Sequence, residues 1–64
     1  MDITPHSIDG VRARLGFNRN LIYKEINAGR LRSFKAGRRR FVTEEACVEY
    51  VRDREAEELT RRQQ

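Results

Sequence analysis

The sequence predicts a small α+β domain with two N-terminal helices, a two-stranded hairpin and a C-terminal helix. Three observations predict it. Apolar residues recur at helical spacing in two short segments that a glycine separates. An arginine-rich stretch then doubles back at a glycine turn, and an acidic stretch with helical spacing follows it. This order of elements is that of a small winged helix-turn-helix, in which the hairpin is the wing.

The chain has 64 residues, enough for one domain with a small core but with little room for an enzyme pocket. We expect residues 1–6 to form a lead-in, residues 7–51 the winged helix-turn-helix domain, and residues 52–64 a charged tail that is helical or frayed. One cysteine and one histidine, Cys47 and His6, argue against a disulfide framework and a structural zinc site, so we expect no metal and no cofactor. No segment is apolar enough to span a membrane and no signal-peptide pattern is present, so we expect a cytoplasmic protein without a membrane partner.

The first helix is expected to begin after Ser7, whose hydroxyl suits the N-cap position. Its inward face consists of Ile8, Val11 and Leu15. Thr4 followed by Pro5 is a competing start, because proline is favoured at the first helical position. Gly10 costs this helix about 1 kcal/mol relative to alanine, so the helix is either weak or closely packed by another segment.

The second helix is expected between Gly16, which ends the first helix, and Gly29, which stops the second. Phe17 fills the corner between the helices, and Asn18 caps the second helix. The predicted inward side consists of Leu21, Ile22, Ile26 and Ala28. The opposite side carries hydrogen-bonding groups and no acid: Arg19, Asn20, Tyr23, Lys24 and Asn27.

These groups are the ones that a DNA recognition helix needs. Arginine can bind guanine and asparagine can bind adenine through two hydrogen bonds each, while lysine, tyrosine and backbone amides hold phosphates. The predicted recognition residues are Asn18, Arg19, Asn20, Tyr23, Lys24 and Asn27. The alternative is an ordinary amphipathic surface helix, but such helices usually carry glutamate mixed with lysine.

The predicted hairpin has a first strand over residues 30–35, a turn at Ala36-Gly37 and a second strand over residues 38–42. Its cations are Lys35, Arg38, Arg39 and Arg40. Because alternate strand residues point to opposite faces, Arg38 and Arg40 are expected to share one face and Arg39 to take the other. We predict that these cations contact the DNA backbone or the minor groove. The alternative is a charged edge that only prevents unwanted strand pairing.

The third helix is expected to begin after Thr43, with Glu44 and Glu45 in its first turn, where acids suit the positive end of a helix. Its predicted inward residues are Cys47, Tyr50 and Val51. Beyond them the tail offers two apolar side chains, Ala56 and Leu59.

Charge is divided sharply along the chain. Residues 12–40 contain ten lysines or arginines against one acid, Glu25, whereas residues 41–60 contain seven acids against Arg52 and Arg54. A concentrated positive patch attracts polyanions, which favours double-stranded DNA as the partner.

Two segments carry a resemblance to a known family: L-G-F-N-R-N-L-I-Y-K-E-I-N-A-G-R-L and K-A-G-R-R-R-F-V-T-E-E-A-C-V-E-Y-V. Their order resembles the excisionase family of small winged-helix proteins and, more broadly, the DNA-binding domain of MerR-type regulators. The matching positions are Gly16, Asn18, Arg19, Tyr23, Gly29, Leu31, Gly37, Arg38 and Val42. By this resemblance the chain is expected to be a recombination directionality factor of a phage or mobile element, acting at the nucleoid of a bacterial host. Such a factor binds and bends attachment-site DNA and helps a tyrosine integrase toward excision, often as several cooperating copies.

The sequence departs from the family pattern at two places. The first helix reads G-V-R where the family has a Glu-Ala-Ala run, and Glu25 stands where the family has an aliphatic residue. We expect Glu25 to form an exposed pair with Arg12 or Arg14, contributing at most about 1 kcal/mol.

Other classes of function remain as alternatives. The first is a stand-alone MerR-like transcriptional regulator, although residues 52–64 lack the sustained apolar heptad positions of a coiled coil. The others are a phage interaction module that holds proteins, and an RNA-binding module, for which Tyr23 is the one good stacking residue. We expect no enzyme and no small-molecule substrate, because His6 is a surface residue, Cys47 a packed thiol and Tyr50 a core residue.

Overall fold

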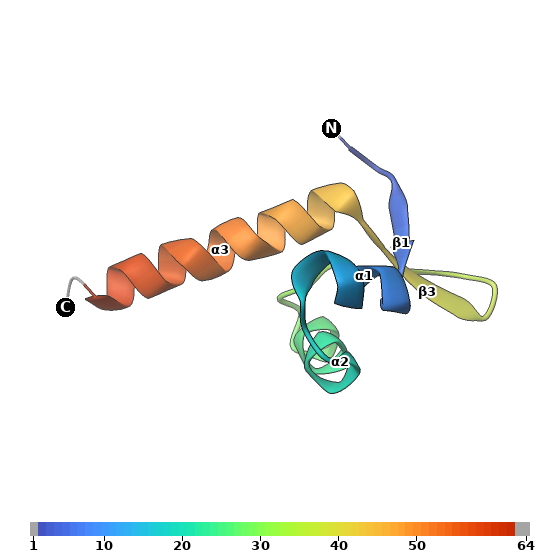
Figure 1. Ribbon diagram of the computed structural model, residues 1–64, viewed down its shortest axis with the longest axis horizontal. Coiled ribbons are helices and arrows are strands. Elements are labelled where there is room, and N and C mark those ends of the chain that lie inside the picture. Colours follow the sequence, from blue (N-terminus) through green and yellow to red (C-terminus); the bar gives the residue numbers. More distant parts are fainter. Residues whose placement is uncertain (1, 63–64) are drawn as a thin grey trace.

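The computed structural model describes residues 2–62 as a small α+β structure with three helices and one antiparallel sheet (Figure 1). The elements in chain order are β1 (Pro5–Ser7), α1 (Ile8–Leu15), α2 (Arg19–Asn27), β2 (Phe34–Ala36), β3 (Arg39–Thr43) and α3 (Glu44–Arg62). Figure 1 shows α1 and α2 close together, with the β2–β3 hairpin projecting on one side of them and α3 extending on the other. The predicted helical tail is thus a direct continuation of α3, as far as the described residues extend.

The sheet has one more strand than the sequence predicted. Its order is β1-β3-β2, so β3 lies in the centre and is antiparallel to both neighbours. Pro5 pairs with Thr43 and Ser7 pairs with Phe41. Pro5 and His6, which belong to the expected lead-in, are thus part of the sheet. Proline lacks a backbone N–H, and its place on this edge strand agrees with that constraint.

The hairpin turns one residue later than predicted. Ala36 pairs with Arg39, so the loop is Gly37-Arg38 rather than Ala36-Gly37. Gly37 has φ of 64°, a value that glycine adopts without strain and that a type II′ hairpin requires at its first loop position. The strands shift accordingly, to residues 34–36 and 39–43. Arg38 lies in the loop, so the predicted sharing of a strand face between Arg38 and Arg40 is wrong.

The helix starts that the sequence predicted are confirmed. The Ser7 hydroxyl accepts a hydrogen bond from the Gly10 amide at 3.2 Å, and Asn18 Oδ1 accepts one from the Leu21 amide at 2.8 Å. The Thr43 hydroxyl accepts one from the Ala46 amide at 3.1 Å. Each bond satisfies a backbone donor that the first turn of a helix leaves without a partner.

The two helix-ending glycines also behave as predicted. Gly16 and Gly29 have φ of 76° and 80°, in the left-handed region where a side chain is unfavourable. Gly10 is closely packed, since a Cβ atom there would lie 3.3 Å from the Cβ of His6 on β1.

The core lies between the helices and the inner face of the sheet. It consists of Ile8, Val11, Ile22, Leu31, Val42, Ala46, Cys47 and Tyr50. Leu15, Phe17, Tyr23 and Ile26 pack against its edge. Two predicted inward residues, Ala28 and Val51, are exposed instead. The buried face of α3 runs along Ala46, Cys47 and Tyr50, so Val51 is carried away from the core.

Glu25 is the buried acid of this core, and its place differs from the sequence prediction. Its side chain is on the inward side of α2, with 7% of the residue exposed. The carboxylate accepts hydrogen bonds from Arg30 at 2.6 Å and from the Tyr50 hydroxyl at 2.6 Å. The expected exposed pair with an arginine of α1 is therefore wrong: Arg14 binds Glu44 instead.

The sharp turn at the end of α2 brings Arg30 back to Glu25. The Arg30 amide donates to the Glu25 carbonyl at 3.1 Å, as in a helix end closed by a glycine. The hydrogen bonds from Arg30 and Tyr50 lower the pKa of Glu25 from its ordinary 4.5 to about 2. Burial and the bond to Glu25 raise the pKa of Tyr50 to about 12.

We predict that acid destabilises the protein through Glu25. A carboxylate whose pKa is lower in the folded state stabilises that state fully above its unfolded pKa, and loses this contribution as the pH falls toward its folded pKa. The free energy of unfolding should therefore fall between about pH 4.5 and about pH 2. Urea unfolding followed by circular dichroism at several pH values measures it. Glu25→Gln should be less stable at pH 6 and should flatten the pH dependence, whereas the exposed Glu55→Gln should not.

Some dependence should remain in the Glu25 variant, because the pKa values of Asp2 and Glu44 are also lowered by their hydrogen bonds. Equal acid sensitivity of the wild type and Glu25→Gln would contradict the prediction.

Candidate nucleic-acid interface

Residues 12–40 form the basic segment of the chain. Ion pairs divide its arginines into those that bind an acid and those that do not. Arg14 binds Glu44 at 2.7 Å, Arg30 binds Glu25 at 2.6 Å and Arg32 binds Glu49 at 2.6 Å. Two of these acids come from α3, so the acidic helix neutralises part of the basic segment. Within residues 2–62, the cations of that segment without an ion pair are Arg19, Lys24, Lys35, Arg38, Arg39 and Arg40. All six belong to α2 or the β2–β3 hairpin.

The exposed side of α2 has the composition that the sequence predicted, except for Tyr23. Ile22 and Glu25 are buried on its inner side. The exposed residues of its outer side are Arg19, Asn20, Lys24 and Asn27. Tyr23 is half-buried against the core, and the guanidinium of Arg19 lies 5.6 Å from its ring centre. The first turn of α2 contains no acid of its own, so no residue of this helix offsets its positive end.

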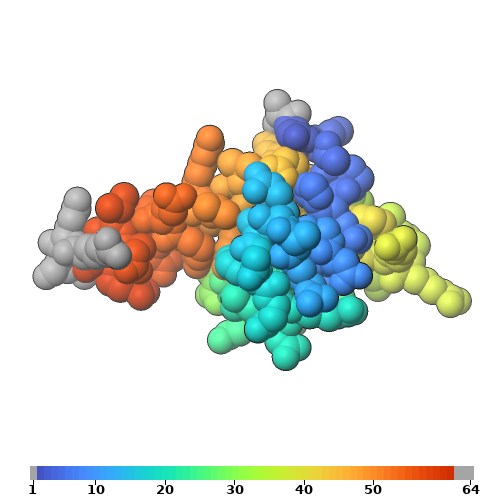
Figure 2. All heavy atoms as spheres, in the orientation of Figure 1, coloured from blue at the N-terminus to red at the C-terminus, as the bar shows by residue number. Residues whose placement is uncertain are grey.

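A hollow joins α2 to the hairpin. It has a volume of about 220 Å³, and its walls are formed by Ser7, Ile8, Asp9, Arg19, Tyr23, Arg38, Arg39 and Arg40. Five of the predicted contact residues, from two segments well separated in sequence, therefore meet at one place. In Figure 2 the surface of α1 and α2, blue to teal, lies beside the projecting hairpin, coloured yellow.

The hairpin cations differ in their freedom to reach a ligand. Arg38, in the loop, and Arg39 are exposed. The guanidinium of Arg39 lies 5.6 Å from the ring centre of Phe41. Arg40 is half-buried, and its Nη1 donates to the Ser33 hydroxyl at 2.7 Å. Arg40 thus binds its own chain and helps to hold the hairpin.

The remaining predicted residues lie outside this hollow. Lys35 is exposed on β2, opposite Arg40, while Asn20, Lys24 and Asn27 lie along the outer side of α2. Asn18 lines a second hollow, of about 520 Å³, between α1 and α2. Its Oδ1 is already engaged as the cap of α2, so in any complex its amide nitrogen is the part of the side chain left to donate a hydrogen bond.

Sequence reasoning missed two residues of this surface, Asp9 and Arg12. Both line the second hollow, together with Ala13, Gly16, Phe17 and Asn18. Their side chains form an exposed ion pair of 3.5 Å. Arg12 is the first cation of the basic residues 12–40, which is a signal for it, whereas the packing pattern of the first helix carries none for Asp9.

The described residues also bear on metal binding, on thiol chemistry and on membrane spans. Among residues 2–62, no group of three or more histidine, cysteine or acidic side chains is placed to hold a metal ion. Cys47 is buried, and burial raises the pKa of its thiol. No helix in the described part of the chain is long and apolar enough to cross a membrane.

Comparisons of this chain with protein-family models, with curated proteins and with solved structures give no match.

We predict that Asn18 is chiefly a structural residue. Asn18→Ala removes the cap of α2 and should lower the free energy of unfolding by about 1 kcal/mol. Asn18→Ser keeps a capping oxygen and should cost only a few tenths of that amount. Urea unfolding of the three proteins measures both effects. Equal stability of the alanine and serine variants would contradict a capping role.

Proposed function

We propose that this chain is a sequence-specific DNA-binding protein of the winged helix-turn-helix type. In this assignment α1 and α2 form the helix-turn-helix and the β2–β3 hairpin is the wing. The observation that carries the proposal is the hollow in which Arg19 and Tyr23 of α2 meet Arg38 and Arg39 of the hairpin. Binding of a duplex by such a protein uses two kinds of contact at once. A helix lies in the major groove, and cations lie on the neighbouring backbone.

In the proposed complex α2 lies in the major groove. Arg19 and Asn20, at its start, suit hydrogen bonds with base edges, since arginine pairs with guanine and asparagine with adenine. Tyr23 and Lys24 suit phosphates, and Asn27 lies one turn beyond Lys24 on the exposed side. This face carries no acid to oppose the DNA backbone.

The wing supplies contacts that do not depend on sequence. Arg38 and Arg39 are exposed and hold no ion pair within the described residues, so they are the hairpin arginines best suited to phosphates or to a narrow minor groove. Lys35 adds a third exposed cation. Arg40, bonded to Ser33, has the smaller part in binding.

Within this class we propose an excisionase. The support is the resemblance of the two quoted segments, together with the size of the module. A single module buries roughly 600–1,000 Å² on DNA, so useful occupancy needs neighbouring copies or a partner such as a tyrosine integrase. Bending the duplex costs about 1–6 kcal/mol, which phosphate and groove contacts must offset. Such a factor positions DNA and performs no chemistry, so the proposed protein is not an enzyme.

One observation favours a stand-alone MerR-like regulator instead. Helix α3 continues without interruption to Arg62 and carries exposed Val51 and Leu59, which a dimer contact could cover. Selection of bound sites from random duplexes, followed by footprinting, separates the two roles. Direct repeats filled cooperatively support the excisionase, whereas an inverted repeat filled by a dimer supports the regulator. Failure to select any sequence, with no salt-dependent affinity, would contradict both.

We predict a division of labour between helix and wing. Arg19→Ala and Asn20→Ala should change the preferred sequence and cost about 1–3 kcal/mol on the selected site. Arg38→Ala and Arg39→Ala should weaken binding to every duplex and lower the salt slope by about 1 each. Fluorescence anisotropy on selected and random duplexes at several salt concentrations measures both. Arg61→Ala, at the far end of α3, is the control for loss of one positive charge.

A uniform loss on selected and random DNA for all four substitutions would contradict this division. So would an equal loss for the Arg61 control, since a general effect of net charge would then explain the result.

A further inference from the structure

The surface assigned to DNA contains one exposed acid. Between Ile3 and Thr43 the sequence has two acids, Asp9 and Glu25. Glu25 is buried and bound to Arg30, so its charge does not face solvent. The side chain of Asp9, in contrast, is 78% exposed.

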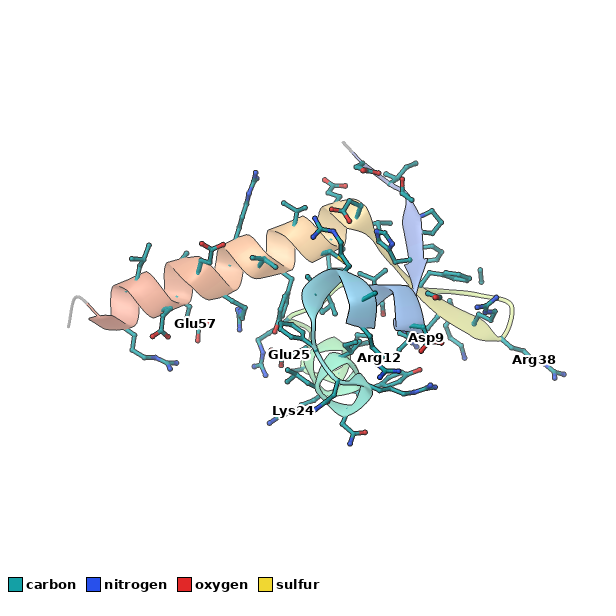
Figure 3. The ribbon with its side chains drawn as sticks, viewed as in Figure 1. Asp9, Arg12, Lys24, Glu25, Arg38 and Glu57 are labelled. Carbon is teal, nitrogen blue, oxygen red and sulfur yellow. The ribbon has the colours of Figure 1, made fainter. Side chains whose placement is uncertain are left out.

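Asp9 lies where the cations of the surface converge. It belongs to the first turn of α1 and lines the hollow formed by Arg19, Tyr23 and the hairpin arginines. It also lines the second hollow, at the start of α2. Figure 3 shows Asp9 at the beginning of α1, between the helix pair and the hairpin that carries Arg38.

The neighbouring cation does not cancel this charge. Arg12 Nη1 lies 3.5 Å from Asp9 Oδ1, and the Arg12 side chain is 52% exposed. An exposed pair at this distance is weak and is screened by salt. The carboxylate therefore remains available to whatever enters the hollow.

We propose that Asp9 is a specificity-determining residue for DNA, an inference that rests on the proposed function. A carboxylate and a phosphate are both negatively charged and both only accept hydrogen bonds, so Asp9 penalises any duplex that brings phosphate into this hollow. An amino group of a base has the opposite effect, because it can donate a hydrogen bond to the carboxylate. The N4 amino group of cytosine donates a hydrogen bond in the major groove, and an acidic side chain is its usual acceptor. Asp9 thus weakens binding to arbitrary DNA more than binding to the preferred site.

If Asp9 only stabilised α1, its side chain would not have to lie beside the arginines of the hollow. An acid in the first turn stabilises a helix through the positive helix end, by about 0.3–1 kcal/mol at the surface. Ser7 already caps α1, and an acid in this turn would give the same help if its side chain faced away from the arginines. The two roles differ in their measurable effect: the structural role changes stability alone, while the proposed role changes the ratio of two affinities.

The experiment compares the wild type with Asp9→Asn, Asp9→Ser and Asp9→Glu on the selected duplex and on a random duplex. Asp53→Asn is the matched control, since it removes the same charge from an exposed position on α3. Binding is measured by fluorescence anisotropy at two salt concentrations, and urea unfolding establishes that each variant is folded.

Asp9→Asn and Asp9→Ser should tighten binding to random DNA about three- to tenfold, with a smaller gain or a loss on the selected site. Asp9→Glu should keep the wild-type ratio of the affinity for the selected duplex to that for the random duplex. Asp53→Asn should also leave this ratio unchanged. An equal gain on both duplexes, or an unchanged ratio in both neutral variants, would overturn the role of Asp9 and leave DNA binding intact. A wild-type protein that binds neither duplex would overturn the proposed function and the role of Asp9 together.

Discussion

The contact of Glu25 with Arg30 and Tyr50 is the constraint on which the arrangement of the helices depends. Helix α2 has nine residues, and isolated helices this short are unstable in water. Its position is fixed by tertiary contacts, and Glu25 provides one that joins α2 both to its own exit turn and to α3. Together with the fully buried Ile22, this contact keeps one side of α2 turned toward the core. This orientation in turn leaves Arg19 and Asn20 facing solvent.

The distribution of charge also depends on acids that pair with arginines of other elements. Glu44 and Glu49 of α3 bind Arg14 and Arg32, so these two arginines hold α3 in place. The cations of residues 12–40 that hold no ion pair within the described residues lie on α2 and the hairpin. The net charge of +4 therefore understates the local field, because the acids and the free cations lie on different parts of the molecule.

The sequence predicted the features that are governed by local chemistry. The caps at Ser7 and Asn18 were predictable, because capping depends on the side chain and on the few residues that follow it. The features it missed are set by distant residues. Strand β1 exists because β3 offers it an edge, and the burial of Glu25 depends on Tyr50, which is 25 residues away. The same holds for the candidate site. Its residues on α2 and the hairpin were predictable from local sequence, whereas Asp9 belongs to it only because of how α1 packs in the fold.

The hairpin is held by contacts beyond the pairing of its own two strands. Strand β3 pairs on both sides, Phe34 stacks on Phe41 with ring centres 5.8 Å apart, and Arg40 binds Ser33 before the first strand of the hairpin. Val42 of β3 and Ile22 of α2 belong to one core, which links the base of the hairpin to α2. In the proposed complex a duplex has to fit both elements together. Where their positions do not match straight DNA, the duplex has to deform, and a small module can in this way impose a bend.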